Sequence, residues 1–233
     1  MNLIEKNILG LIILVFCFTT EAGTWPQIPV PKNEHIIIIS DNMIVNGLPV
    51  KSMELTSRKS VTDILNFYKK KWKKAVKKGA PGYIVNEVKP YKIISRLENG
   101  YLMTVQVKRN GMRGSYSLLA ISQLPKKNEI IKSLGAGFPK MNTTTVLSDI
   151  QTVDIGQKGR TLIMENSFSL QSNINYYRDY FLKRGWVEVG GKALVNKKLG
   201  ASVMMMNKSN NELNITFNRH KKKTHIVAVK VDK

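Results

Sequence analysis

Apolar and polar residues alternate along much of this chain, which is the pattern of strands in an antiparallel sheet with one solvent-facing side. The alternation is clearest in YLMTVQV (101–107) and HIVAVKV (225–231). Turn sequences such as Asn99-Gly100 separate neighbouring runs. The pattern predicts three strands late in each half of the chain, at 91–98, 101–109, 115–122, 201–208, 212–220 and 225–231.

A helix is expected ahead of each set of three strands, at 61–78 and around 175–183. Each helix follows a strand-like stretch, at 43–55 and 152–165. The Asn46-Gly47 pair between apolar residues predicts a tight hairpin in the first of these stretches.

The two halves repeat one plan at an offset of 109 residues. The aligned pairs in the helices are Asn66 with Asn175, Phe67 with Tyr176, Tyr68 with Tyr177, and Trp72 with Phe181. We therefore expect an α+β fold of two tandem β-β-α-β-β-β modules. Each module would be an antiparallel sheet with one helix packed on one face.

The same reasoning divides the chain into five segments. They are a signal peptide (1–22), an extended Pro-rich arm (23–34), a first α+β module (35–122), a linker (123–145) and a second α+β module (146–233). The linker is rich in Gly, Pro and Lys, as connections between domains often are.

The first residues indicate export. Ile8–Phe18 is an apolar run of signal-peptide length, and Thr20 and Ala22 offer small side chains for cleavage after Ala22. Cys17 is the sole cysteine and would leave with this segment. The mature chain would then have no disulfide and no transmembrane segment, which fits a bacterial periplasm.

Positive charge dominates the composition, with 37 Lys+Arg against 16 Asp+Glu and a net charge of +21. The excess is spread evenly, since 24–125 hold 17 basic and 6 acidic residues and 126–233 hold 19 and 8. Such a charge favours an anionic partner, although lysines also serve solubility alone.

Seven lysines crowd into residues 69–78, on the expected helix 61–78. Ser60 and Asp63 predict its N-terminal cap, and Gly79 its end. Residues at helical spacing form an apolar stripe: Val61, Ile64, Leu65, Tyr68, Trp72, Ala75 and Val76. On the other face, lysines four residues apart would repel one another. The candidate anion-binding residues are Lys69, Lys70, Lys73, Lys74 and Lys77, and the alternative is a solvated helix face.

Phe67 and Tyr176 occupy equivalent positions beside, rather than on, the apolar stripes of their helices. We expect neither ring to reach the sheet of its own module. The repeated position predicts a contact, either between the two modules or with a partner protein. The alternative is that a neighbouring loop covers each ring.

Catalytic and metal-binding motifs are not evident in the sequence. His220 and His225 flank three lysines in an expected hairpin turn, where a metal cation would be repelled. We expect no catalytic residue, no metal site and no cofactor, and hence no enzyme. Nucleic acid is disfavoured as a partner, because a platform for stacking bases normally has aromatic residues on adjacent strands, and the expected strands do not show this pattern. Export also removes most nucleic acids as partners.

These observations predict a non-catalytic binding or assembly protein of the bacterial cell envelope, such as an adaptor in a secretion or pilus-type complex. The expected partner is an envelope protein complex or an anionic surface. The alternative is a basic protein that binds an anionic envelope polymer, a lipid or DNA through helix 61–78.

Overall fold

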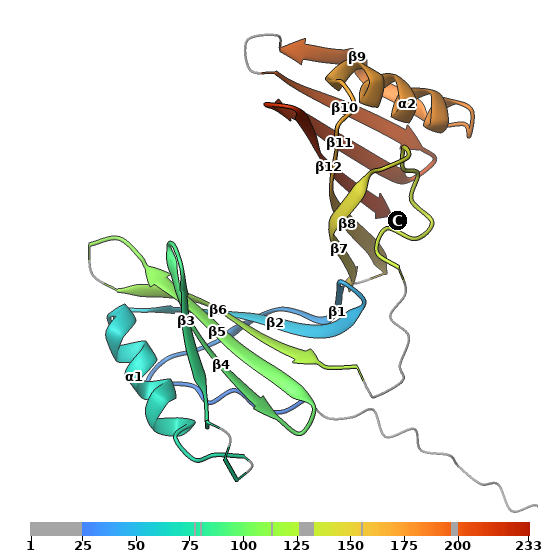
Figure 1. Ribbon diagram of the computed structural model, residues 1–233. Coiled ribbons are helices and arrows are strands. Elements are labelled where there is room, and N and C mark those ends of the chain that lie inside the picture. Colours follow the sequence, from blue (N-terminus) through green and yellow to red (C-terminus); the bar gives the residue numbers. More distant parts are fainter. Residues whose placement is uncertain are drawn as a thin grey trace, which may run out of the picture.

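In the computed structural model, the described residues form one antiparallel sheet of twelve strands, accompanied by two helices (Figure 1). The structure describes residues 25–76, 78–79, 81–112, 114–125, 133–154, 156–196 and 200–233. The expected signal peptide 1–22 and the candidate residue Lys77 lie outside this described part.

Strands and helices follow the same order in both halves of the chain. The first half comprises β1 (Ile37–Val45), β2 (Leu48–Ser57), α1 (Val61–Lys71), β3 (Ile84–Val88), β4 (Tyr91–Glu98), β5 (Tyr101–Arg109) and β6 (Ser115–Gln123). The second half comprises β7 (Thr145–Asp154), β8 (Gln157–Asn166), α2 (Leu170–Leu182), β9 (Val187–Asn196), β10 (Ala201–Lys208), β11 (Asn211–His220) and β12 (Lys223–Asp232).

The expected order β-β-α-β-β-β is wrong by one strand in each half, because β3 and β9 were not predicted. All five residues of β3 are exposed, so the strand has no buried face to produce an alternating pattern. The sequence of β9 contains Gly190 and Gly191, which favour turns over strands. The six strands predicted late in the halves do form, within two residues of the expected ends.

The two halves do not form separate sheets, because β1 pairs with β7 and joins them edge to edge. The strand order is β3-β4-β5-β6-β2-β1-β7-β8-β12-β11-β10-β9. At the junction Met43 faces Thr152, and these residues are 109 positions apart, the offset of the sequence repeat. Equivalent residues face each other in this way across a two-fold axis.

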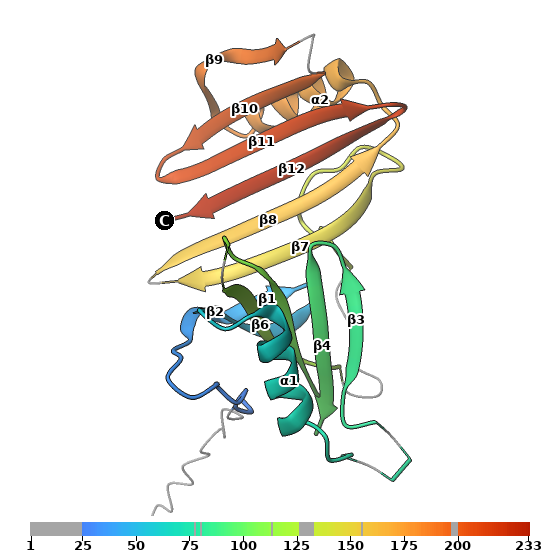
Figure 2. The ribbon, with the colours of Figure 1, turned by 90° about the vertical axis from the view of Figure 1, so that its left-hand side faces the viewer.

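Each helix covers one end of the sheet and buries its own core. α1 packs against β4 and β5, and α2 packs against β9, β10 and β11. Tyr68 and Trp72 enter the first core, and the aligned Tyr177 and Phe181 enter the second. Figure 2 shows the two helices at opposite ends of the molecule, as in Figure 1.

Helix α1 begins as predicted and ends earlier than predicted. Ser60 and Asp63 form the expected capping box at its start. The helix ends at Lys71 with Trp72 as its C-cap, so the expected helix 61–78 is seven residues too long. Gly79 lies in a turn with φ of 84° and does not end the helix. Every pair of lysines expected to repel at a spacing of four residues includes Lys73 or Lys74, and both lie beyond the end of the helix. The expected repulsion along a helix is therefore wrong.

The Pro-rich arm lies against the first core. Ile28 is buried in it, and the Trp25 ring packs edge-on against Tyr101 with a centroid distance of 5.8 Å. The described part of this arm, residues 25–34, belongs to no strand. It therefore adds apolar area to the core of the first half.

Neither of the two described helices has the length and apolar character needed to cross a membrane.

Candidate functional site

The basic segment, which we define as residues 69–78, runs from the last turn of α1 into the loop that follows. Lys69, Lys70 and Lys71 lie on the helix, where the negative end of its dipole favours cations. Lys73, Lys74 and Lys78 lie in the loop and are exposed. The structure therefore places the described candidate lysines next to one another, but on two different local structures.

None of the described lysines in the basic segment forms an ion pair with a described carboxylate; the ion pairs present lie elsewhere in the molecule. One of them, Lys71, has its Nζ 5.8 Å from the centroid of the Phe67 ring. These ammonium groups therefore concentrate positive charge on one exposed part of the surface, which favours binding of anions.

The side chain of Arg96, on β4, contacts the loop of the basic segment from the side of the sheet. Its Nη1 donates hydrogen bonds to the carbonyl oxygens of Trp72 (3.1 Å), Lys74 (2.9 Å) and Gly82 (3.0 Å). The last carbonyls of a helix have no partner within the helix, so this guanidinium supplies one. This buried side chain thus connects the loop at Trp72, Lys74 and Gly82 to β4.

Glu98 completes the Arg96 site. Its carboxylate accepts hydrogen bonds from Arg96 Nε (3.0 Å) and Nη2 (3.2 Å). These bonds lower the pKa of Glu98, which therefore stays ionised and fixes the plane of the guanidinium. Because Glu98 is paired with Arg96, this carboxylate does not form an ion pair with a lysine of the basic segment.

Gly82 allows the loop to close on the helix end. A Cβ atom at this position would lie 2.1 Å from the Trp72 carbonyl oxygen and 2.7 Å from that of Lys73. Contacts so short do not occur between real Cβ atoms and oxygens, so a side chain here would displace the backbone. The close approach therefore requires glycine.

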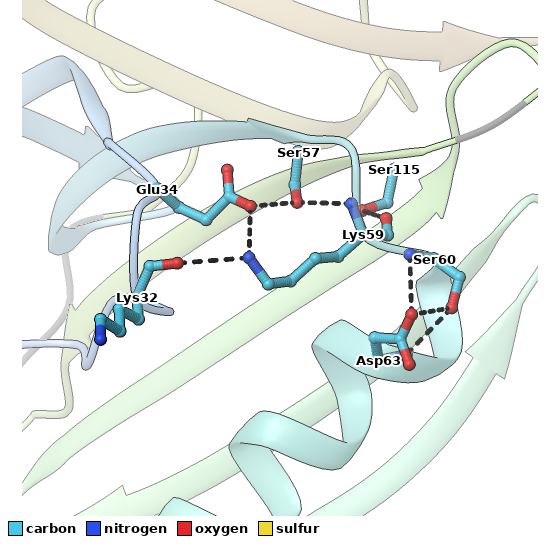
Figure 3. Close-up of polar contacts among 7 residues, drawn as sticks. All are labelled: Lys32, Glu34, Ser57, Lys59, Ser60, Asp63 and Ser115. Atoms are coloured by element: carbon cyan, nitrogen blue, oxygen red, sulfur yellow. Dashed lines mark hydrogen bonds and ion pairs between the residues drawn. The ribbon is translucent and has the colours of Figure 1, made fainter.

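A second polar cluster lies at the start of α1 (Figure 3). Glu34 Oε1 accepts from Lys59 Nζ and from Ser57 Oγ, both at 2.7 Å. These two hydrogen bonds lower the pKa of Glu34. Ser57 Oγ in turn accepts from the Lys59 backbone N–H (2.9 Å), and Lys59 Nζ also donates to the Lys32 carbonyl (3.2 Å). The cluster ties the arm to the turn before α1.

Part of this cluster recurs in the second half at the offset of the repeat. Ser115 Oγ donates to the Lys59 carbonyl at 2.8 Å. Thr224 Oγ1, 109 positions later, donates to the Phe168 carbonyl at 2.7 Å, and Phe168 is 109 positions after Lys59. A contact that both halves make in the same place supports the turn before each helix.

The Ser57 position also recurs. Asn166, 109 positions later, accepts from the Phe168 backbone N–H at 3.1 Å, as Ser57 accepts from Lys59. Its side-chain amide then exchanges hydrogen bonds with Asn173 of α2, at 2.8 and 3.0 Å. Because the second half keeps the backbone contacts without a lysine, the common role of this cluster is structural.

Phe67 and Tyr176 lie in equivalent places, each half-buried against the core of its own half. Phe67 packs edge-on against Tyr68, and Tyr176 against Tyr177, both with a centroid distance of 5.1 Å. The expected contact between them across the modules is wrong, because α1 and α2 lie at opposite ends of the sheet (Figures 1 and 2). A contact of either ring with a partner protein stays a prediction.

One arrangement of aromatic residues on the sheet was not predicted from the sequence. Lys108 Nζ lies 5.2 Å from the centroid of the Tyr91 ring and 5.4 Å from that of Tyr116. These residues belong to the adjacent strands β4, β5 and β6, so aromatic residues do share one region of the sheet. These residues lie near strand ends and far apart in the sequence, so the hydropathy pattern alone did not predict that they are close in space.

The two histidines take the places expected beside a hairpin turn. His220 ends β11, Lys221 adopts a φ of 53° in the turn, and His225 lies in β12. His225 Nδ1 is 3.8 Å from a carboxylate oxygen of Glu165. Within the described residues, no group of three or more side chains could hold a metal ion.

Comparison with known proteins does not assign a family to the chain. No protein-family model matches it, and searches of curated proteins and of solved structures find no similar protein.

Proposed function

We propose that this protein is an exported, non-catalytic binding protein of the bacterial cell envelope, which acts as an adaptor in a larger assembly such as a secretion or pilus-type complex. One observation carries the proposal. A buried arginine, Arg96, binds the carbonyl oxygens of Trp72 and Lys74 in the basic segment, and the described lysines of this segment form no ion pair with a described carboxylate. An acidic surface on a partner would supply the missing negative charge.

We also propose that the chain consists of two tandem modules that arose from one duplicated unit, of which only the first binds this partner. The repeated polar contacts before α1 and α2 support the duplication. Lys69 aligns with Arg178 at the offset of 109. Arg178 forms a bidentate ion pair with Glu188, at 2.8 and 3.1 Å, so its charge is neutralised within the second half.

A non-catalytic role agrees with the way the polar cluster at the start of α1 is bonded. A serine and a lysine form a nucleophile and base only if the lysine is neutral and contacts the serine hydroxyl. Here the Lys59 ammonium donates a hydrogen bond to Glu34, and the Ser57 hydroxyl donates a hydrogen bond to the same carboxylate. Both side chains are therefore occupied in holding the turn.

The test compares how well a charge-reversed variant and a control variant retain envelope proteins in pull-downs. Lys70→Glu/Lys73→Glu/Lys74→Glu removes the exposed positive charge of the basic segment, and we expect it to lose defined partners in pull-downs from envelope extracts. The control variant carries the same change in net charge at exposed lysines elsewhere, Lys158→Glu/Lys221→Glu/Lys222→Glu. Equal retention by both variants, or equal loss, would contradict a role for the basic segment.

The second candidate function is binding of an anionic envelope polymer, a lipid or DNA through residues 61–78. The exposed lysines of the basic segment, which form no ion pair with a described carboxylate, favour it as well. Because the apolar stripe of α1 is buried against β4 and β5, a membrane would be bound through its headgroups alone. Salt-sensitive retention on anionic lipid or wall polymer, without any defined protein partner, would favour this candidate.

A further inference from the structure

Strand β3 is one of the two end strands of the sheet and pairs only with β4. All five of its residues are exposed, and the five residue pairs with β4 run in register without a bulge. The outer side of such a strand presents unpaired N–H and C=O groups that can pair with another strand. β3 therefore offers a regular, uncovered edge.

The other end strand, β9, differs from β3 in this respect. Its pairing with β10 shifts register between Val203 and Met205, and Gly190 adopts a φ of 78°. A bulge of this kind twists an edge away from further pairing. Of the two ends of the sheet, β3 is the one suited to accept another strand.

Apolar side chains line the β3 edge on the face away from the core. Ile84 is 57% exposed and Val88 is 62% exposed. Leu97, in the adjacent β4, is 56% exposed. Alternation puts these three on one face, because Ile94 and Arg96 point from β4 into the core. An added strand with apolar residues at alternate positions would cover them.

Lysines flank both ends of this apolar edge. Lys73 and Lys74 lie in the loop that Arg96 holds, and Arg96 is adjacent to Ser95, the residue that faces Ile84 at the start of β3. Lys89 and Lys92 follow the other end, and both are exposed. The strand itself has one acidic residue, Glu87, which faces Lys92. The charge around the edge is therefore positive at both ends.

We propose that β3 binds an extended, acidic segment of the partner protein, which adds to the sheet as a further strand. The segment would have apolar residues at alternate positions and carboxylates on both sides of them. This inference rests on the proposed function, since it names the kind of partner that the basic segment recognises. Backbone hydrogen bonds would supply affinity, and the flanking lysines would supply selectivity and faster association.

A second copy of the chain fits this edge less well. Two β3 strands paired antiparallel would bring Lys73 and Lys74 of one molecule close to Lys89 and Lys92 of the other. Like charges at both ends of the pair would oppose association, in a chain that already carries +21. The charges thus favour an acidic partner over self-association.

The probe is a labelled synthetic peptide of alternating valine and threonine with glutamates at each end. Its binding to the full chain lacking residues 1–22 is measured by fluorescence anisotropy. Val88→Asp should weaken binding at least about tenfold, because it removes apolar contact and repels the glutamates. The control Val187→Asp, on β9 at 65% exposure, should change binding less than about twofold. N-methylation of alternate peptide N–H groups should also weaken binding at least about tenfold, because it blocks strand pairing.

Three results would overturn this inference. The first is equal binding of the N-methylated peptide, which would show attraction by charge alone. The second is equal weakening by Val88→Asp and Val187→Asp. The third is a dimer of the unmodified chain that Val88→Asp abolishes, which would assign the edge to self-association. In each case, loss of envelope partners by the Lys70/Lys73/Lys74 variant would still support the proposed function.

Discussion

Asn46 and Asp149 exchange two hydrogen bonds across the junction between the halves of the sheet. The Asn46 backbone N–H donates to the Asp149 carbonyl at 2.8 Å, and the Asp149 N–H donates to Asn46 Oδ1 at 2.9 Å. The Asp149 carboxylate also accepts from Arg160 at 2.7 Å and from the Gly135 N–H at 2.8 Å. Asp149 thus connects the first hairpin, β8 and the segment before β7.

Asn46→Gly should lower the free energy of unfolding by about 1 kcal/mol, the usual contribution of one hydrogen bond. Glycine accepts the φ of 52° at this turn, so the change removes only the side-chain contact with Asp149. Asn99→Gly is the control, because Asn99 has a φ of 51° in a similar turn away from the junction. Urea unfolding measures both, and an equal effect would contradict a role for Asn46 at the junction.

Arg96→Met should open the loop of the basic segment. The carbonyls of Trp72, Lys74 and Gly82 would lose their donor, at a cost of about 1–3 kcal/mol. Limited trypsin digestion should then cleave faster after Lys73 and Lys74, as mass spectrometry of the fragments would record. Arg109→Met is the control, since Arg109 is exposed and donates to the nearby Met112 carbonyl. Unchanged cleavage in the Arg96 variant would show that the loop does not depend on this side chain.

Tyr68→Phe should raise the free energy of unfolding by about 1 kcal/mol. The Tyr68 side chain is fully buried, and its hydroxyl has no hydrogen-bond partner among the described residues. Removing an unpaired buried hydroxyl relieves a desolvation cost. Tyr116→Phe is the contrasting variant, because it removes a 3.0 Å hydrogen bond to Glu54 and should lower stability. Destabilisation by Tyr68→Phe would indicate that its hydroxyl is bonded after all.

Stability should fall as the pH rises above about 10, where tyrosines of the unfolded chain ionise. Burial raises the pKa of Tyr68 and of Tyr177 in the folded protein. The folded state therefore keeps protons that the unfolded state releases, so alkaline pH favours unfolding. Chemical denaturation across this pH range should show a smaller loss for Tyr68→Phe/Tyr177→Phe than for the unsubstituted chain. Equal losses would contradict this origin of the pH dependence.

Local features of the fold followed from the sequence alone, because neighbouring residues determine them. Ser60 and Asp63 lie three residues apart and form the predicted capping box. Asn46 and Gly47 both adopt the positive φ that a tight hairpin turn needs, as predicted. The strands at 91–98 and 101–109 have the predicted ends, since each buries one face and so alternates in sequence.

The tertiary structure alone decided where α1 ends, how the halves join and which edge of the sheet stays open. The apolar stripe that predicts the helix continues to residue 78 in the sequence, but α1 ends at Lys71. Beyond Lys71, Arg96 on a distant strand binds carbonyl oxygens, and a hydropathy pattern cannot predict such hydrogen bonds. The junction of β1 with β7 comes mainly from backbone hydrogen bonding, and the hydropathy pattern does not specify which strand a given strand pairs with. β3 escaped prediction because a fully exposed strand buries no face, and only its position at the end of the sheet reveals it.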